Sequence, residues 1–246
     1  MVTETVPPED DESILAAPVM STARLEAFSD GVFAIAITLL ILEIHVPDPA
    51  TFRDGLGLAL AHLWPSYLAY SITFLLIGMI WLNHHLMFHY IIRINRTLMI
   101  LNLLLLLSVS FLPFPTAVLA DAVTEGEGEK VAAAFYGIVL IMGGVFFNAI
   151  WIYASRSHQH LGEHISPTQA RRIRARFGVG PFLYLVAVLL SWVSATVSIC
   201  FYVVLLLSYF IDVSPKPAEV AQSAEAPQPV GPPGPGAFTT IANKES

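Results

Sequence analysis

Apolar runs of membrane-spanning length recur along this chain, and they restrict its possible folds more than any other feature of the sequence. The first of them is almost free of polar residues from Gly31 to Leu42. A helix of about 20 residues rises roughly 30 Å, which matches the hydrocarbon core of a bilayer. Only 13% of the residues are charged, about half the share of a typical soluble domain. The sequence therefore predicts an all-α polytopic membrane protein.

Six helical spans account for the apolar runs. Pro47 and Pro49 end the first span, because a proline disfavours helix at the residue before it. Pro65 is expected to occupy a first helical turn or to kink the second span, and Pro113 and Pro115 are expected to bend the outer end of the third. The predicted spans are 22–45, 57–83 with an extension toward Ile92 left open, 97–120, 131–154, 177–193 and 196–212, the last two forming a tight hairpin.

The two ends of the chain differ in composition from the spans. Residues 1–20 are acidic, contain prolines and lack the basic start of a signal peptide. Residues 213–246 are rich in Pro, Ala and Gly and show no helical period. We therefore expect a transmembrane domain over residues 21–212 between two disordered tails. A polar loop is expected between the fourth and fifth spans.

Basic residues predict the orientation in the membrane. With six spans, both termini and most arginines lie on one side, while the opposite loops carry only Arg53 and Lys130. The positive-inside rule then places both termini in the cytoplasm. The basic segment 171–176 is explained by this topology alone or by a specific site for anionic lipid. The arginines on the predicted cytoplasmic side are Arg24, Arg93, Arg96, Arg156, Arg171, Arg172, Arg174 and Arg176.

A polar motif, R-x-x-x-F-S-D, opens the first span with Arg24, Phe28, Ser29 and Asp30. An ionisable residue at the depth of Asp30 is costly, so it is expected to face protein or water. The sequence W-L-N-H-H at 81–85 lies at a similar predicted depth in the second span. An aspartate bonded to an imidazole or an amide there would make a structural polar network, and a proton relay is the alternative.

An apolar stripe with a single hydroxyl follows this motif along the first span. Its members are spaced by three and four residues, so they share one helical face. Such a stripe could face lipid, form a packing seam or line a pore. The stripe consists of Ile35, Thr38, Leu39 and Leu42.

The R-x-x-x-F-S-D motif and the apolar stripe with one threonine resemble the first helix of the lysosomal/endosomal potassium channel family, transmembrane protein 175, and its bacterial homologues. The W-L-N-H-H sequence strengthens this resemblance. The resemblance covers roughly residues 20–210. It implies a homotetramer of six-helix subunits in which the first helix lines a central pore. Animal members carry two such repeats in one chain, whereas R-x-x-x-F-S-D occurs once here, as in the bacterial form.

The resemblance also assigns roles to individual residues. It implies a constriction at Ile35, a pore-facing hydroxyl at Thr38 and further apolar rings at Leu39 and Leu42. It implies a structural polar network near the cytoplasmic side. The members of this network are Arg24, Phe28, Ser29, Asp30, Trp81, Asn83 and His84.

The expected function is therefore a potassium-permeable cation channel of the cell membrane. No carbonyl selectivity filter of the T-V-G-Y-G type and no arginine-rich voltage sensor is visible in the sequence, and no enzyme motif is recognisable. The expected partners are identical subunits, membrane lipid and permeant potassium, with no nucleic acid, metal site or other cofactor.

Two other classes of protein stay open alongside the channel. One is a proton-coupled transporter that uses Asp30 and the span-two histidines, and the other is a haem-binding membrane protein. Glu43 and His45, at the outer end of the first span, could form a cation-attracting vestibule or simply mark the membrane interface.

Overall fold

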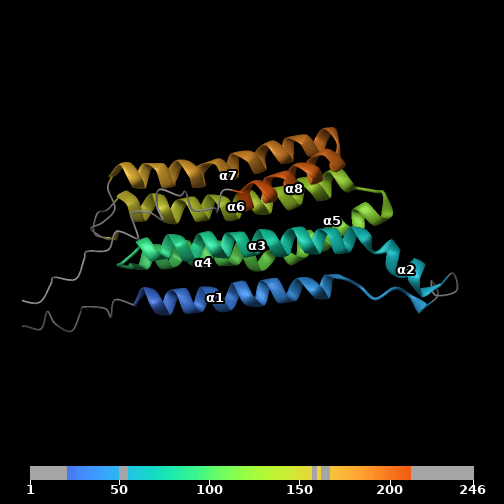
Figure 1. Ribbon diagram of the computed structural model, residues 1–246, viewed down its shortest axis with the longest axis horizontal. Helices are drawn as coiled ribbons and strands as arrows, with labels where there is room; N and C mark the ends of the chain where they lie inside the picture. Colours follow the sequence, from blue (N-terminus) through green and yellow to red (C-terminus); the bar gives the residue numbers. More distant parts are fainter. Residues whose placement is uncertain (1–20, 50–54, 157–159, 162–166, 212–246) are drawn as a thin grey trace, which may run out of the picture. The chain divides into compact units, whose positions relative to one another are not determined.

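The computed structural model describes residues 21–49, 55–156, 160–161 and 167–211. The predicted tails, 1–20 and 213–246, lie outside the described residues. The helices as far as Tyr209 belong to one unit, and of the second unit, Phe210–Ser246, only the end of the last helix is described. The elements are α1 Thr22–Leu39, the 3₁₀ helix η2 Leu40–Glu43, α2 Leu56–His62, α3 Trp64–Tyr90, α4 Arg96–Phe111, α5 Pro113–Glu125, α6 Glu129–Arg156, α7 Pro167–Val193 and α8 Ala195–Ile211 (Figure 1).

Five of these helical segments are long and apolar enough to cross a membrane, and they correspond to the first five predicted spans. The sixth predicted span corresponds to a shorter apolar helix within α8, Ala195–Ser208. Only Ser194 separates α7 from α8, and the Ser198 hydroxyl donates to the carbonyl oxygen of Ala187 at 2.8 Å. This bond joins the start of α8 to α7 beside the turn between them, and the tight hairpin stays a prediction.

Prolines set two of the helix boundaries inside the predicted spans. The second span is not one helix: it breaks at Leu63, and Pro65 lies in the first turn of α3. A first-turn proline is tolerated because the amide hydrogen it lacks would have no helical partner there. α3 then continues to Tyr90, in agreement with the extension toward Ile92 that the sequence left open. The third span breaks at Leu112, directly before Pro113, as the prolines led us to expect.

The start of the fifth span differs most from the prediction. α7 begins at Pro167, ten residues before the expected start, so part of the predicted polar loop is helical. Proline is well suited to a first helical position, and Ala, Gln and Arg are good helix formers. Apolar content predicts only the part of a helix that lies in the membrane. The first turns of α7 are polar, so apolar content could not indicate that the helix begins there.

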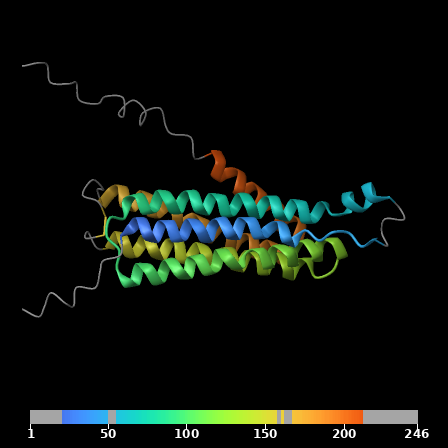
Figure 2. The same cartoon turned by 90° about the horizontal axis from the view of Figure 1, so that it is seen from below.

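Helix α1 packs on one side only. It lies against α3 and α4 (Figure 2), and its buried residues recur at spacings of three and four. These residues are Leu25, Ser29, Phe33 and Ala36, and Leu40 at the start of η2 continues the pattern. The stripe predicted from the sequence lies on the opposite, exposed side of the helix.

Glycines on α6 allow its neighbours to approach closely. A Cβ atom on Gly144 would lie 2.9 Å from Cγ of Pro181 on α7. A Cβ atom on Gly137 would collide with the hydroxyl of Tyr202 on α8 and with Val188 on α7. Gly137 and Gly144 therefore lie at helix contacts, as is common for small residues in membrane helices.

An amide of α6 compensates for the proline inside α7. Pro181 has no amide hydrogen, so the carbonyl of Phe177, four residues earlier, loses its helical partner. Asn148 Nδ2 donates to that carbonyl oxygen at 3.0 Å and to the carbonyl of Gly144 at 2.8 Å. The side chain thus satisfies the freed carbonyl and joins α6 to α7.

One end of the bundle collects the starts of α1, α4 and α7 with the ends of α3 and α6 (Figure 1). The amide of Ile92 donates to the carbonyl of His160 at 2.8 Å, and Asn95 Nδ2 donates to the hydroxyl of Tyr153 at 2.8 Å. Exposed arginines gather at this end, as the sequence predicted, and its position on the cytoplasmic side stays a prediction. They are Arg24, Arg93, Arg96, Arg156, Arg171, Arg172 and Arg174.

Candidate functional site

The stripe on α1 is exposed over its whole length in the single chain. The side chain of Ile35 is 60% exposed and that of Leu42 is 67% exposed, and Thr38 and Leu39 are exposed as well. Across the helix, Phe33 and the other buried residues fix α1 against α3 and α4. A bulky apolar face that no part of its own described chain covers needs either lipid or other subunits around it.

The last member of the stripe lies outside the α-helix. α1 ends at Leu39, and Leu42 belongs to the 3₁₀ helix η2, whereas the sequence predicted one continuous helix to residue 45. A 3₁₀ turn is tighter and commonly ends an α-helix. Glu43, the last residue of η2, is half-buried beside Tyr70 and Thr116, while His45 is exposed.

Thr38 directs its hydroxyl hydrogen back to its own helix. Its Oγ1 lies 3.0 Å from the carbonyl oxygen of Ala34 and 2.9 Å from that of Ile35. A hydroxyl has one hydrogen to donate and two lone pairs that accept. With the hydrogen directed to the backbone, the oxygen lone pairs remain for an outside donor or a cation.

A buried chain of hydrogen bonds supports α1 from behind. Asn102 Nδ2 on α4 donates to Ser29 Oγ at 2.9 Å, and Ser29 in turn donates to the carbonyl of Leu25 at 2.8 Å. Nε2 of His84 on α3 lies 2.9 Å from Asn102 Oδ1. An amide oxygen only accepts, so Nε2 carries the hydrogen in this orientation of the amide. Three helices are thereby joined through three fully buried side chains.

Aromatic rings enclose the histidine of this chain. The ring of His84 stacks on Phe88 of its own helix, with centroids 4.4 Å apart, and lies 5.3 Å from the ring of Phe33. Sequence reasoning named Ser29 and His84 and missed Asn102, which lies in a leucine-rich run outside either motif. A polar amide within an apolar span was the signal that could have identified it.

Asp30 belongs to a separate and more exposed pair. The indole Nε1 of Trp81 donates to Asp30 Oδ1 at 2.8 Å. The sequence placed Trp81 in the group of candidate partners but favoured an imidazole or an amide and a buried site. The donor is instead the indole, and the pair is exposed in the single chain. Nearby, Nδ1 of His85 lies 3.9 Å from a carboxylate oxygen of Glu26, a contact that the sequence reasoning also missed.

Three residues predicted for the network lie away from it. Arg24 and Phe28 are exposed on the same side of α1 as Ile35, and within the described part of the chain no hydrogen bond or ion pair joins them to Asp30. Asn83 lies on another face of α3, where its Nδ2 donates to the carbonyl of Met79 at 2.8 Å. Its position beside a cavity between α3, α6 and α7 follows from this orientation.

A second buried polar cluster lies nearer the opposite end and was not foreseen. Thr73 Oγ1 on α3 lies 3.0 Å from the Thr116 hydroxyl on α5 and 2.9 Å from the Tyr136 hydroxyl on α6. The ring of Tyr136 meets that of Tyr202 at 5.3 Å, and the Tyr202 hydroxyl donates to α6 at Ala133. These bonds hold together the helices behind α1.

Comparison with known proteins connects this geometry to one family. A family model described as the endosomal/lysosomal potassium channel TMEM175 matches residues 24–113, which include α1, α3 and α4. A potassium channel of Streptomyces collinus is 44% identical over 200 residues, covering 81% of this chain and 97% of the relative. The endosomal/lysosomal proton channel TMEM175 of Gallus gallus is 37% identical over 142 residues, which cover 55% of this chain and 28% of the relative.

A solved structure agrees with these relatives. The crystal structure of a lysosomal potassium-selective channel TMEM175 homologue from Chamaesiphon minutus superposes with a TM-score of 0.71 at 39% identity. The match covers 78% of this chain and 97% of that one. The resemblance noted in the sequence thus extends to the arrangement of the helices.

Proposed function

Because this chain belongs to the TMEM175 family of potassium channels, we propose that it conducts potassium through a pore lined by α1 from several identical subunits. The family is one of ion channels, not of enzymes, and its members are membrane proteins with several spanning helices. Three features of the pore are assigned below: the surface that lines it, the number of chains around it and the residues that narrow it.

The observation that carries the proposal is the one-sided packing of α1. Its rear face is fixed to α3 and α4, whereas Ile35, Thr38, Leu39 and Leu42 are exposed in one chain. A single α1 cannot enclose a path, and the motif occurs once per chain. A homotetramer with α1 at its axis would convert each exposed residue into a ring of four.

The restriction proposed for this pore is apolar rather than a carbonyl filter. Rings of Ile35, Leu39 and Leu42 would narrow the path and resist wetting. At Thr38 the hydroxyl oxygens, whose hydrogens are directed to the backbone, would replace part of the hydration shell of a potassium ion. Potassium takes part in this mechanism as the permeant ion, and the mechanism requires no cofactor.

The polar contacts behind α1 act as a scaffold in this proposal. The bonds from Asn102 to Ser29 and to His84 hold the pore helix at a fixed position on α3 and α4. Arg24, Phe28 and Asp30 are exposed at the same end and would be covered where subunits meet. The arginine-rich end would face the cytoplasm by the positive-inside rule.

Ion flux from liposomes containing the purified full-length chain tests the function. Potassium, sodium and proton gradients are applied separately, with protein-free liposomes as the control. We expect potassium to flow down its own gradient when no proton gradient is present. Potassium movement that requires an opposing proton gradient would favour the proton-coupled transporter over the channel, with Asp30 and the span-two histidines as its candidate proton carriers.

A further inference from the structure

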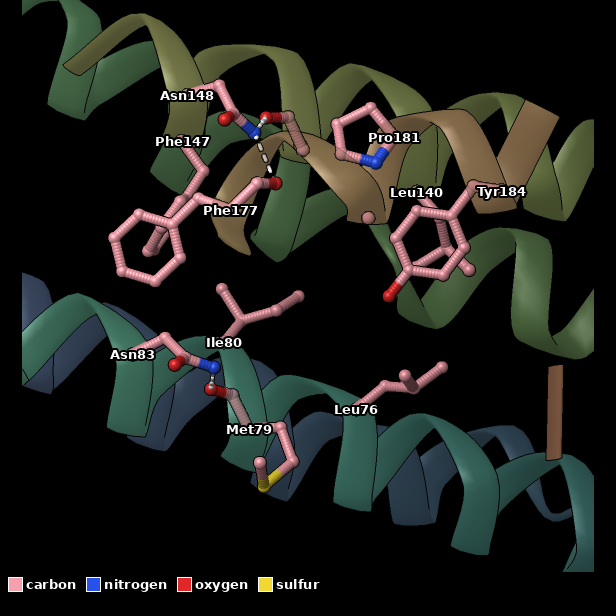
Figure 3. Close-up of a pocket in the computed structure, with 13 residues that line it drawn as sticks. Leu76, Met79, Ile80, Asn83, Leu140, Phe147, Asn148, Phe177, Pro181 and Tyr184 are labelled. Carbon is pink, nitrogen blue, oxygen red and sulfur yellow. Dashed lines mark hydrogen bonds between the residues drawn. The ribbon is translucent and has the colours of Figure 1, made fainter. Parts of the chain in front are cut away.

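A cavity of about 80 Å³ lies between α3, α6 and α7 on the side of α3 away from α1 (Figure 3). It is partly open at the surface of the bundle, and most of its lining is apolar. Ile80 points into it from α3, and Phe147 and Phe177 face it from α6 and α7. The pore proposed above uses none of these residues.

Small residues and a proline line the cavity where α6 meets α7. These residues are Gly143 and Gly144 on α6 and Gly180 and Pro181 on α7, with Gly144 packed directly on Pro181. The amide nitrogens of its two asparagines, Asn83 and Asn148, already donate to backbone carbonyls. Both donors of Asn148 are directed to backbone carbonyls of α6 and α7, as described above. The site therefore favours an apolar occupant.

The size of the cavity narrows the choice of occupant. A drug-sized ligand needs a pocket of roughly 300–1,000 Å³. A volume of about 80 Å³ instead accommodates a slim segment, such as a few methylene groups. The chain is a multi-pass membrane protein, so the apolar molecules around an opening between its spanning helices are lipid acyl chains.

An exposed arginine lies on the same stripe of α7 as the cavity. Arg174, Phe177, Pro181 and Tyr184 follow one another at spacings of three, four and three residues, so they share one helical face. At about 1.5 Å per residue, the cavity residues lie roughly 5–15 Å deeper than Arg174. Since one leaflet contributes about 15 Å of hydrocarbon, Arg174 lies at the depth of a headgroup when the cavity lies among acyl chains.

We propose that the cavity between α3, α6 and α7 holds part of an acyl chain of an anionic phospholipid whose phosphate is bound by Arg174. Arg171, one turn earlier on α7, is also exposed and adds positive charge at the same level. An arginine fork matches phosphate geometry, and basic groups beside a spanning helix favour anionic over zwitterionic lipid. The apolar cavity and the arginine thus select two different parts of the same molecule.

Lipid binding by the purified full-length channel in detergent tests this site without any measurement of ion flux. Phosphatidylglycerol and phosphatidylcholine with identical acyl chains are titrated separately, and bound lipid is counted by native mass spectrometry. Glycerol phosphate, which has no acyl chain, is the third ligand. We expect phosphatidylglycerol to bind at least several-fold more tightly than phosphatidylcholine, and glycerol phosphate not to bind measurably.

Two variants separate the parts of the site. Arg174→Gln should weaken phosphatidylglycerol about fivefold and leave phosphatidylcholine unchanged, while Arg174→Lys retains the preference. Ile80→Phe fills the cavity and should weaken both lipids. Leu189→Phe, the same enlargement at an exposed position of α7 outside the cavity, should have no effect.

Three outcomes would overturn the proposal. Unchanged phosphatidylglycerol binding in both Arg174→Gln and Ile80→Phe would show that lipid binds elsewhere. A loss in Arg174→Gln with none in Ile80→Phe would reduce the arginine to a headgroup contact and leave the cavity without an acyl chain. A change in subunit number in Ile80→Phe would show that another subunit, not lipid, occupies the cavity. Each of these results is independent of whether the protein conducts potassium.

Discussion

Asn102 on α4 donates a hydrogen bond to Ser29 on α1 across 2.9 Å, so the helix proposed to line the pore is held through a buried amide. The same amide accepts from His84 on α3, and all three residues are fully buried. The position of α1 therefore depends on specific polar contacts as well as on apolar packing.

Asn102→Leu should lower the thermal stability of the purified channel. It removes the partner of His84 inside the bundle, and an unsatisfied buried group costs about 1–3 kcal/mol. The loss is expected at the lower end of that range, because hydrogen bonds within membrane helices contribute modestly. Thermal unfolding in detergent measures it. Asn83→Leu is the control, since its amide bonds only its own helix, and an equal loss in both variants would argue against the three-helix support.

The pair of Asp30 and Trp81 makes a different prediction. Asp30→Leu should reduce the yield of assembled channel more than it changes ion selectivity, because the indole hydrogen loses its acceptor. Asp30→Asn keeps an acceptor oxygen and should be milder. Trp81→Phe should match Asp30→Leu, and the double variant should add little to either. Size-exclusion profiles report assembly and flux ratios report selectivity.

Arg24, the first residue of the R-x-x-x-F-S-D motif, is tested in the same assembly and flux measurements. Arg24→Ala should also lower assembly more than selectivity, since Arg24 is exposed at the end where subunits are proposed to meet. If Arg24→Ala or Asp30→Leu assembled normally but showed an altered ion preference, these residues would contribute to the pore rather than to the scaffold.

Asn148 and Pro181 form a pair that a double-mutant cycle can test. Asn148→Leu leaves the carbonyl of Phe177 without a donor, so the free energy of unfolding should fall by about 1–3 kcal/mol. Pro181→Ala restores the amide hydrogen that α7 lacks at this position. In the Pro181→Ala background, Asn148→Leu should therefore cost much less. Identical costs in both backgrounds would show that the amide does not compensate for the proline.

The sequence predicted the helices wherever apolar content and helical structure coincide. The fourth predicted span, 131–154, lies inside α6, Glu129–Arg156, and the prolines at 65 and 113 indicated two helix boundaries correctly. Prediction failed at α7, whose first ten residues are helical but polar. Hydropathy measures affinity for the membrane and not the hydrogen bonds of the backbone, so it could not place that start.

In the candidate site too, the sequence predicted features that depend on one helix and did not predict features that depend on how helices pack together. The spacing of Ile35, Thr38 and Leu39 correctly predicted a shared exposed face, since it depends on α1 alone, and Leu42 in η2 is exposed as well. The partner of Asp30 depends on how α3 is rotated, and spacing within a single helix does not determine that rotation. Asn83 and His84 are adjacent in sequence yet bond in different directions for this reason.

Cysteine cross-linking tests whether α1 lies at a symmetry axis. Ile35→Cys and Leu39→Cys, each in a Cys200→Ser background, should form disulfides between subunits on mild oxidation, because both positions would approach their symmetry mates. Ala36→Cys is the control, since Ala36 is buried against the chain's own helices. Non-reducing electrophoresis reads the result. If neither Ile35→Cys nor Leu39→Cys formed cross-links in assembled channels, α1 would not lie at the symmetry axis.

The constriction makes the most specific prediction about ion flow. If Ile35 forms an apolar ring, Ile35→Ala removes bulk from every subunit at one level, so current should rise and potassium preference should fall. Ile35→Asn changes volume little but allows the level to be wetted, so it should also raise current. Thr38→Ala removes only the hydroxyl ring and should reduce potassium preference with a smaller change in current. Ile41→Asn is the matched control, because Ile41 is equally apolar and 52% exposed but lies about 120° around the helix from Ile35. Equal effects of the two asparagine variants, or unchanged conductance in assembled Ile35→Asn channels, would show that this stripe does not line the pore.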